Sequence, residues 1–185
     1  MIRWFAFFPV VLLSGCALLP SSPESATRPM QPEIVPFAVN GRVSINHQEK
    51  KHSAGLRWIH LAQLDEILLL NPLGQTVARV YRDAENATLD SDGKHFQADD
   101  VESLMQQELD WHLPLNSLHH WVLGLPADDS PAQIERAENG QIAMMYQDGW
   151  EVKYLRYDEN LPARLQLSHE DLLVQLLIDE WDWNP

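Results

Sequence analysis

Apolar and polar residues alternate with a period of two over most of this chain, a pattern typical of β-strands whose two faces differ. Tight hairpin turns are indicated by Asp92-Gly93, Asn139-Gly140 and Asp148-Gly149. No long internal repeat is apparent. The pattern predicts eleven strands, over 39–45, 54–58, 67–70, 75–81, 85–89, 95–97, 133–137, 142–146, 150–157, 164–167 and 172–178.

Two segments between the sixth and seventh predicted strands have a helical period instead. The first, 98–109, places Val101, Leu104, Met105 and Leu109 on one face, and Asp99 and Glu102 have the spacing of a capping box. The second begins at Pro114, a favourable first helical position, and carries a broad apolar stripe that includes Leu118, Trp121 and Val122. Gly124 and Pro126 are expected to end it.

The loop at 71–74 is unusual because a large apolar residue stands at its tip. Pro72 disfavours helix in Asn71, and Gly74 can adopt a positive φ, so Asn71-Pro72-Leu73-Gly74 predicts a turn between two strands. Loop tips are normally polar. Leu73 therefore either folds back over the end of the sheet or projects for a purpose, and the hairpin alone does not decide between them.

Several predicted strands are apolar on both faces, which is unusual for a sandwich whose outer face is wet. A strongly curved sheet that packs helices, or that encloses a cavity on its inner side, is one way to use two apolar faces. The sequence thus favours a mainly β domain with a few helices.

Residues 1–15 have the features of a signal peptide: one positive charge at Arg3, a short apolar run and small residues before Cys16. The run is shorter than the roughly 20 residues that span a bilayer. Residues 13–16, Leu-Ser-Gly-Cys, resemble the lipobox of bacterial lipoproteins. This resemblance implies cleavage before Cys16, a diacylglycerol on its sulfur and a third acyl chain on its new α-amine. The alternative is a free thiol after an ordinary signal peptide.

The single cysteine of the chain favours lipidation, since one thiol cannot form an internal disulfide. Three acyl chains should anchor the protein permanently. Ala17, by its likeness to enterobacterial sorting signals, favours the outer membrane. Five prolines between Leu19 and Pro36 predict that residues 16–36 are a lipidated N-terminus and flexible tether, followed by one domain over 37–185.

The formal net charge of −14 makes nucleic acid or an anionic lipid surface an unfavourable partner. No phosphate-binding glycine motif occurs, so the sequence gives no sign of a nucleotide or other cofactor. Asp99, Asp100 and Glu102 are better explained by the helix dipole than by catalysis. His112, His119 and His120 are the best metal candidates, but no recognisable ligand spacing surrounds them, and surface histidines are the favoured interpretation.

No serine-nucleophile motif surrounds Ser117 and His120, so we predict no enzyme activity. The tryptophans, together with Met105, Met144 and Met145, suit either an ordinary core or an adaptable lining for a flexible apolar ligand. The sequence leaves these two interpretations open.

Three blocks of the chain are distinctive: 68–74 (Leu-Leu-Leu-Asn-Pro-Leu-Gly), 93–100 (Gly-Lys-His-Phe-Gln-Ala-Asp-Asp) and 114–126 (Pro-Leu-Asn-Ser-Leu-His-His-Trp-Val-Leu-Gly-Leu-Pro). In this order they resemble the LolB family of outer-membrane lipoprotein receptors, and weaker matches occur at Gly41-Arg42, Trp58 and Trp150. The likeness extends from about Phe37 to Leu177. Family members carry a helix ahead of the first strand, whereas 27–36 is proline-rich here.

The resemblance implies an unclosed antiparallel β-barrel of about eleven strands, with a helical lid over a hydrophobic cavity. It implies that a monomer accepts the acyl chains of client lipoproteins from the periplasmic carrier LolA and inserts them into the outer membrane. Leu73, in the loop Asn71-Pro72-Leu73-Gly74, would take part in delivery. The residues we expect to line the cavity are Trp58, Leu68, Leu70, Met105, Leu118, Trp121, Val122 and Trp150.

The alternative is a lipocalin-like ligand-binding or scaffolding lipoprotein, anchored by acyl chains but without insertion activity. Neither nucleotide nor metal is expected in either case. Without a nucleotide, transfer has to be downhill, from the carrier to a better-fitting cavity and then to the bilayer.

Overall fold

The computed structural model describes residues 35–109 and 111–185, which belong to one compact unit. Two helices, α1 (Val101–Leu109) and α2 (Leu115–Val122), separate two runs of strands. No helix in these residues is long and apolar enough to cross a membrane. The strands are β1 (Phe37–His47), β2 (Lys50–Leu61), β3 (Leu64–Leu70), β4 (Thr76–Arg82), β5 (Ala87–Ser91), β6 (Lys94–Ala98), β7 (Gln133–Arg136), β8 (Ile142–Gln147), β9 (Trp150–Asp158), β10 (Leu161–His169) and β11 (Leu172–Asp182).

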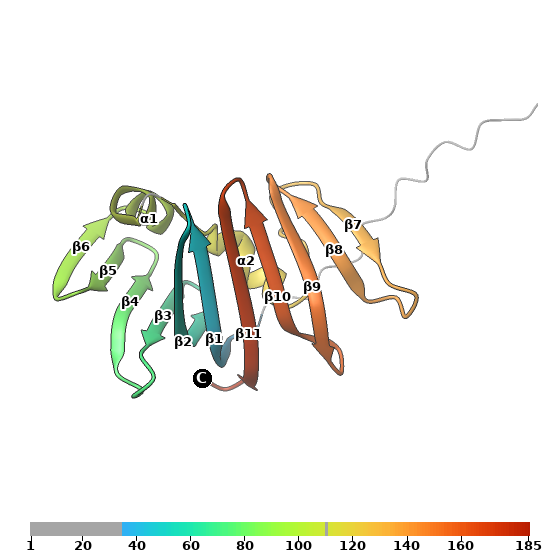
Figure 1. Cartoon of the computed structure of the whole chain (residues 1–185), viewed down its shortest axis with the longest axis horizontal. Helices are drawn as coiled ribbons and strands as arrows, with labels where there is room; N and C mark the ends of the chain where they lie inside the picture. Colours follow the sequence, from blue (N-terminus) through green and yellow to red (C-terminus); the bar gives the residue numbers. More distant parts are fainter. Residues whose placement is uncertain (1–34, 110) are drawn as a thin grey trace, which may run out of the picture. The chain divides into compact units, whose positions relative to one another are not determined.

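All eleven strands form one antiparallel sheet in the order β6-β5-β4-β3-β2-β1-β11-β10-β9-β8-β7. The sheet therefore consists of two meanders, β1 to β6 and β7 to β11, that meet where β1 pairs with β11 at the centre (Figure 1). In this described part of the chain the edge strands β6 and β7 do not pair with each other, so the barrel is unclosed. The predicted fold class and strand number are confirmed.

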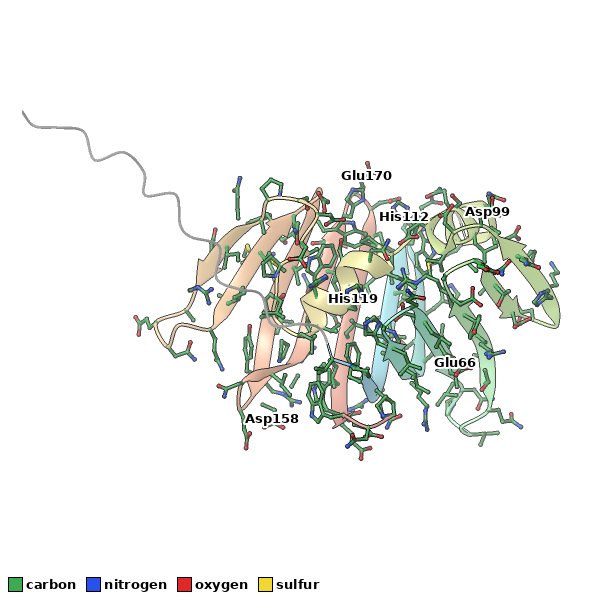
Figure 2. The ribbon with its side chains drawn as sticks, turned by 180° about the vertical axis from the view of Figure 1, so that it is seen from behind. Glu66, Asp99, His112, His119, Asp158 and Glu170 are labelled. Atoms are coloured by element: carbon green, nitrogen blue, oxygen red, sulfur yellow. The ribbon has the colours of Figure 1, made fainter. Side chains whose placement is uncertain are left out.

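The chain order explains why the helices cover a face of the sheet. The segment with α1 and α2 connects β6 to β7, the two opposite edges, so it has to cross the sheet. Figure 2 shows α2 in front of the strands when the sheet is seen from this side. We call this side the helix face and the opposite side the outer face.

Period-two alternation assigns side chains to these faces. Val43, Leu56 and Leu176 belong to the core cluster on the helix face, whereas their chain neighbours Arg42 and Leu177 do not. α1 packs on β5 and β6. The core thus lies between the helix face of the sheet and the two helices.

The start of α1 differs from the prediction. Asp100, not Asp99, caps the helix, because its Oδ1 accepts a hydrogen bond of 2.7 Å from the Ser103 backbone N–H. Ala98 is still paired with Ala87 at the end of β6, so the helix begins at Val101 and not at 98.

Candidate functional site

The loop between β3 and β4 is held by the side chain of Asn71. Its Oδ1 accepts hydrogen bonds from the backbone N–H groups of Leu73, at 2.9 Å, and Gln75, at 3.0 Å. The Gly74 N–H donates to the Asn71 carbonyl at 2.9 Å, and Gly74 has a φ of +79°, a conformation that favours glycine. The loop is thus a defined structure with its own internal bonds.

Leu73 projects from this loop into solvent. Its side chain is 83% exposed, more than any other large apolar residue of the described chain. Of the two interpretations left open by the sequence, folding back over the sheet end is therefore excluded in this structure. A large apolar side chain is presented to solvent by a loop whose backbone bonds are satisfied.

Large side chains attach α2 to the sheet. Trp121 is fully buried, and its Nε1–H donates a hydrogen bond of 2.8 Å to Gln147 Oε1 at the end of β8. The Tyr154 hydroxyl of β9 donates to the Trp121 carbonyl at 3.0 Å, and the Trp121 and Trp150 rings lie 6.0 Å apart. These hydrogen bonds satisfy the buried indole N–H of Trp121 and the buried hydroxyl of Tyr154.

The two helices are also linked to each other. Glu102 of α1 accepts a hydrogen bond of 3.1 Å from the Leu115 backbone N–H at the start of α2. This N–H lacks a partner within its own helix, so Glu102 acts as a cap for α2. The sequence pattern instead predicts that Glu102 pairs with Asp99 in a capping box at the start of the first helix.

A buried carboxylate lies beneath the helices. Asp65 of β3 is 0% exposed, and its Oδ1 accepts a hydrogen bond of 2.8 Å from Trp58 Nε1–H and lies 2.8 Å from His60 Nδ1. Arg82 of β4 donates to Asp65 Oδ2 and also to Asn116 Oδ1 of α2. This guanidinium therefore connects the sheet to the N-terminal end of α2.

The charge state of Asp65 reflects two opposed influences. Burial disfavours ionisation, but hydrogen bonding from His60 and the positive charge of Arg82 outweigh it and lower the pKa of Asp65 below its ordinary value. The carboxylate is thus ionised at neutral pH and balanced by the Arg82 guanidinium.

Three histidine rings extend this network onto α2. The His60 and His119 rings stack with centroids 4.6 Å apart, and His119 lies 4.3 Å from His120. Figure 2 shows His119 on α2. Its Nδ1–H donates to the Leu115 carbonyl at 3.0 Å. The interpretation of these residues as surface histidines is wrong for His119, which is packed between two other rings.

Burial and the neighbouring His120 and His60 lower the pKa of His119 to about 4. Burial likewise lowers the pKa of His120, against the opposing influence of Asp128 and Asp129. Both rings are therefore neutral at physiological pH. Within the described residues, no three His, Cys, Asp or Glu side chains are placed to hold a metal ion.

The sequence matches the family model described as outer membrane lipoprotein LolB over residues 35–181. The chain belongs to the LolB family. An outer-membrane lipoprotein LolB from Chromobacterium violaceum is 38% identical over 179 residues, with 92% of this chain and 93% of that protein covered. One from Nitrosomonas europaea is 37% identical over 153 residues, covering 79% and 72%.

Among solved structures, a LolA superfamily protein from Nitrosomonas europaea has a TM-score of 0.50 and is 10% identical, with 82% of this chain and 87% of that chain covered. At this identity the likeness concerns the fold alone.

Six of the eight residues that we predicted to line a cavity in this LolB-family chain lie on the helix face. All six are at most 4% exposed and belong to one core cluster: Trp58, Met105, Leu118, Trp121, Val122 and Trp150. The structure places them in a closed interior, and their role as a lining for acyl chains stays a prediction.

The prediction that Leu68 and Leu70 line the cavity is wrong, because both side chains point to the outer face. Ile67 pairs with the core residue Trp58, and both Ile67 and Leu69 pack against the core, so the alternate positions in β3 face the other way. Leu70 instead lines a groove of about 600 Å³ on the outer face. Cys16 and the proline-rich segment up to residue 34 lie outside the described residues.

Sequence reasoning missed both the Asp65 network and the outer groove. Asp65 alternates with Ile67 and Leu69, so a strand that extends back from residue 67 places its carboxylate on their face, and this was a usable signal. The groove had no such signal, since it is formed by five strands whose order the sequence did not predict.

We expect the stability of this LolB-family fold to fall as the pH is lowered from 7 to 5. The unfolded chain binds a proton at His119 below about pH 6.5, whereas the folded chain remains neutral there until about pH 4. The stabilisation by neutral His119 is therefore complete above pH 6.5 and is lost progressively between about 6.5 and 4.

Urea unfolding at pH 7.5 and 5.0 measures this effect. His119→Gln should show a smaller difference between the two midpoints than the wild type, whereas His52→Gln, at an exposed position, should behave as the wild type. An unchanged pH dependence in His119→Gln would contradict the assignment.

Proposed function

We propose that this LolB-family protein receives the acyl chains of lipoproteins from the periplasmic carrier LolA and incorporates the lipoproteins into the outer membrane. The observation that carries the proposal is Leu73, 83% exposed on an internally bonded loop. An exposed leucine is costly in water but favourable in lipid, so this tip suits contact with the bilayer.

The chemistry of the cargo requires a protected route. Each methylene exposed to water costs about 0.8 kcal/mol, so three acyl chains would cost tens of kcal/mol if released between membranes. The apolar cluster beneath α1 and α2 is the natural shelter. An acyl chain would enter between the helices and the sheet and replace side-chain contacts such as those of Trp121, Met105 and Leu118.

The proposed activity is binding and transfer, without a catalytic step. The carrier-to-receptor step requires only that the acyl chains fit better beneath these helices than in the carrier, and the bilayer is the final acceptor. Arg82, bonded to both Asp65 and Asn116, is positioned to hold α2 closed until cargo arrives.

A transfer experiment tests the proposal. Full-length protein in liposomes is mixed with a triacylated client bound to LolA, and the client recovered in the liposome fraction is measured with time. Delivery should be much faster than from LolA alone. A client that binds to the protein but never reaches the liposomes would instead favour the alternative, an anchored ligand-binding or scaffolding lipoprotein.

We further propose that residues 1–15 are removed, that 16–36 are a lipidated tether and that the domain over 37–185 faces the periplasm as a monomer. Cys16→Ala should then move the protein from the membrane to the soluble fraction, because the acyl chains are its anchor. The melting temperature should stay the same, since the tether precedes the first strand at Phe37. Fractionation and thermal unfolding measure both results, and wild-type membrane partitioning of Cys16→Ala would contradict the anchor.

A further inference from the structure

The outer face, away from the proposed acyl shelter, has a groove with its own chemistry. Its volume is about 600 Å³, within the range of roughly 300 to 1,000 Å³ typical of small-molecule sites. It extends to Asn71 and Pro72, the first residues of the loop that carries Leu73. The groove therefore begins beside the proposed membrane contact.

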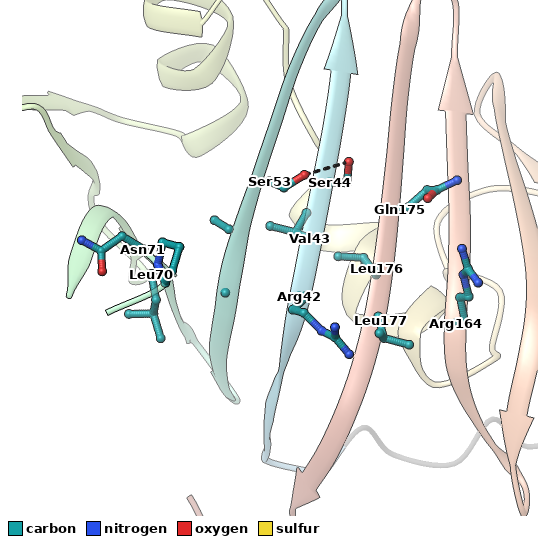
Figure 3. Close-up of a pocket in the computed structure, with 13 residues that line it drawn as sticks. Arg42, Val43, Ser44, Ser53, Leu70, Asn71, Arg164, Gln175, Leu176 and Leu177 are labelled. Carbon is teal, nitrogen blue, oxygen red and sulfur yellow. Dashed lines mark hydrogen bonds between the residues drawn. The ribbon is translucent and has the colours of Figure 1, made fainter. Parts of the chain in front are cut away.

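One row of paired residues crosses five strands in this groove. Leu70 of β3 pairs with Gly55 of β2, Gly55 with Arg42 of β1, Arg42 with Leu177 of β11, and Leu177 with Arg164 of β10. Paired residues point to the same side of a sheet, so this row has a single orientation. Figure 3 shows Arg42 and Arg164 on either side of Leu177.

Gly55 makes the surface of the sheet hollow at this point of the row. It has no side chain, and a Cβ built there would lie 3.2 Å from the Cβ of Leu70, closer than is usual. The apolar side of the groove thus runs from Gly55 to Leu70 and Pro72, on the side of Arg42 away from Leu177. This strip ends at the Leu73 loop.

The charge of the groove is opposite to that of the chain. Its lining contains two arginines and no carboxylate among the described residues, in a protein of net charge −14. Arg42 has a carboxylate neighbour outside the lining, Asp179, at 3.3 Å, and both side chains are about half exposed or more. Exposed pairs of this kind are weak and can be exchanged for another anion.

Arg42 and Arg164 lie two strands apart, about 10 Å between backbones, and both side chains are long enough to reach one phosphate above Leu177. Arginine binds phosphate through parallel N–H donors. The acyl chains of a client lipoprotein carry no phosphate, so the two arginines do not match the cargo.

We propose that the outer groove is a binding site for a single bilayer phospholipid, with its phosphate between Arg42 and Arg164 and its acyl chain over Gly55 toward Leu70 and Pro72. The net charge of the chain disfavours an anionic surface as a whole, but this local site binds one anionic head group. The direction of the tail rests on the proposed membrane contact of Leu73, whereas binding itself does not.

Monomeric lipid tests the groove separately from membrane delivery. Dihexanoyl phosphatidylglycerol, kept below its micelle concentration, is titrated into the full chain carrying Cys16→Ala, and backbone amide NMR shifts are followed. We expect saturable shifts at Gly55 and Leu177. Arg42→Gln combined with Arg164→Gln should weaken binding by about tenfold or more, because two charge-assisted hydrogen-bonding groups are lost.

Lys50→Gln combined with Lys94→Gln removes the same charge from two exposed hairpin ends and should leave the affinity unchanged. Equal weakening in this control, or no saturable shift in the wild type, would overturn the proposal. Glycerol 3-phosphate and dihexanoylglycerol separate the two halves of the ligand. If glycerol 3-phosphate binds as tightly as the phospholipid, the groove is a site for phosphate alone; if dihexanoylglycerol does, it is a site for acyl chains alone. Either result would also overturn the proposal.

Gly55→Val fills the groove without a change of charge and should reduce phospholipid binding, with thermal unfolding as the check that the sheet is intact. Leu73→Glu should leave binding of monomeric lipid unchanged. A loss of delivery in Leu73→Glu with normal lipid binding would support the proposed function and the groove separately.

Discussion

Leu73→Glu should abolish delivery of client lipoproteins to liposomes while the protein remains folded and accepts clients from the carrier. The residue is 83% exposed, and surface substitutions of this kind usually change stability by about 0.5 kcal/mol or less. The hydrogen bonds of Asn71 that hold the loop involve the backbone of residue 73 and not its side chain.

The functional loss has a simple physical origin. Placing a charged group in the hydrocarbon costs roughly 2.5 to 3.5 kcal/mol on insertion scales, which decreases the population of the inserted state by on the order of a hundredfold. Leu73→Met, which keeps an apolar tip, is the matched control and should deliver normally. Thermal unfolding, carrier-to-receptor transfer and receptor-to-liposome transfer are measured on one preparation of each variant.

Two outcomes would contradict this assignment. Normal delivery by Leu73→Glu would remove the loop from the insertion step. A decrease in stability of several kcal/mol would instead show that the side chain packs against the sheet in solution.

Asp65→Ala should destabilise the fold strongly, by about 3 to 5 kcal/mol. It leaves the Arg82 guanidinium, whose side chain is only 17% exposed, without its carboxylate partner, and it removes the acceptor of Trp58 Nε1–H. Because Arg82 also donates a hydrogen bond to Asn116 of α2, α2 should pack less firmly on the sheet as well.

Asp179→Ala is the matched control, since it removes the carboxylate of an exposed pair with Arg42 and should cost at most about 1 kcal/mol. Urea unfolding at pH 7 measures both variants. Equal, small losses would show that the buried pair adds nothing to the fold.

The pH dependence supplies a second measurement. Since the pKa of Asp65 is lowered in the folded state, its stabilisation is present above the unfolded value of about 4 and is lost as the pH falls through the folded value. Wild-type protein should therefore lose stability below about pH 4, and Asp65→Ala should lack that part of the acid transition.

The eleven strands and two helices could be predicted because their signals are local. Period-two alternation or a short apolar run bounded by turn residues located the strands, and Asp92-Gly93, with φ values of 52° and 74°, forms the expected hairpin turn. Strand order could not be obtained in this way, because the pairing of β1 with β11 joins segments at opposite ends of the domain.

The sequence could not predict which face of the sheet a side chain points to where apolar and polar residues do not alternate. Ile67 to Leu70 is a run of four apolar residues, so nothing in the run decides whether Leu68 or Leu69 faces the core. The decision comes from the partner strand, in which Trp58 is buried opposite Ile67. Leu73 was identified correctly as unusual because Pro72, which restricts φ, and Gly74, which permits a positive φ, predict a turn there from local sequence alone.

The central pairing of β1 with β11 also has a consequence for folding kinetics. Hairpins within each meander join near neighbours, whereas the contact of Asn40 with Glu180 spans 140 residues. Closing so long a loop lowers the stability only modestly but slows folding, so the pairing of β1 with β11, which we call the seam, should form late. The row of the outer groove crosses the seam between Arg42 and Leu177. A newly exported chain whose halves have not yet joined therefore lacks the complete groove, which would make phospholipid binding a property of the finished fold alone.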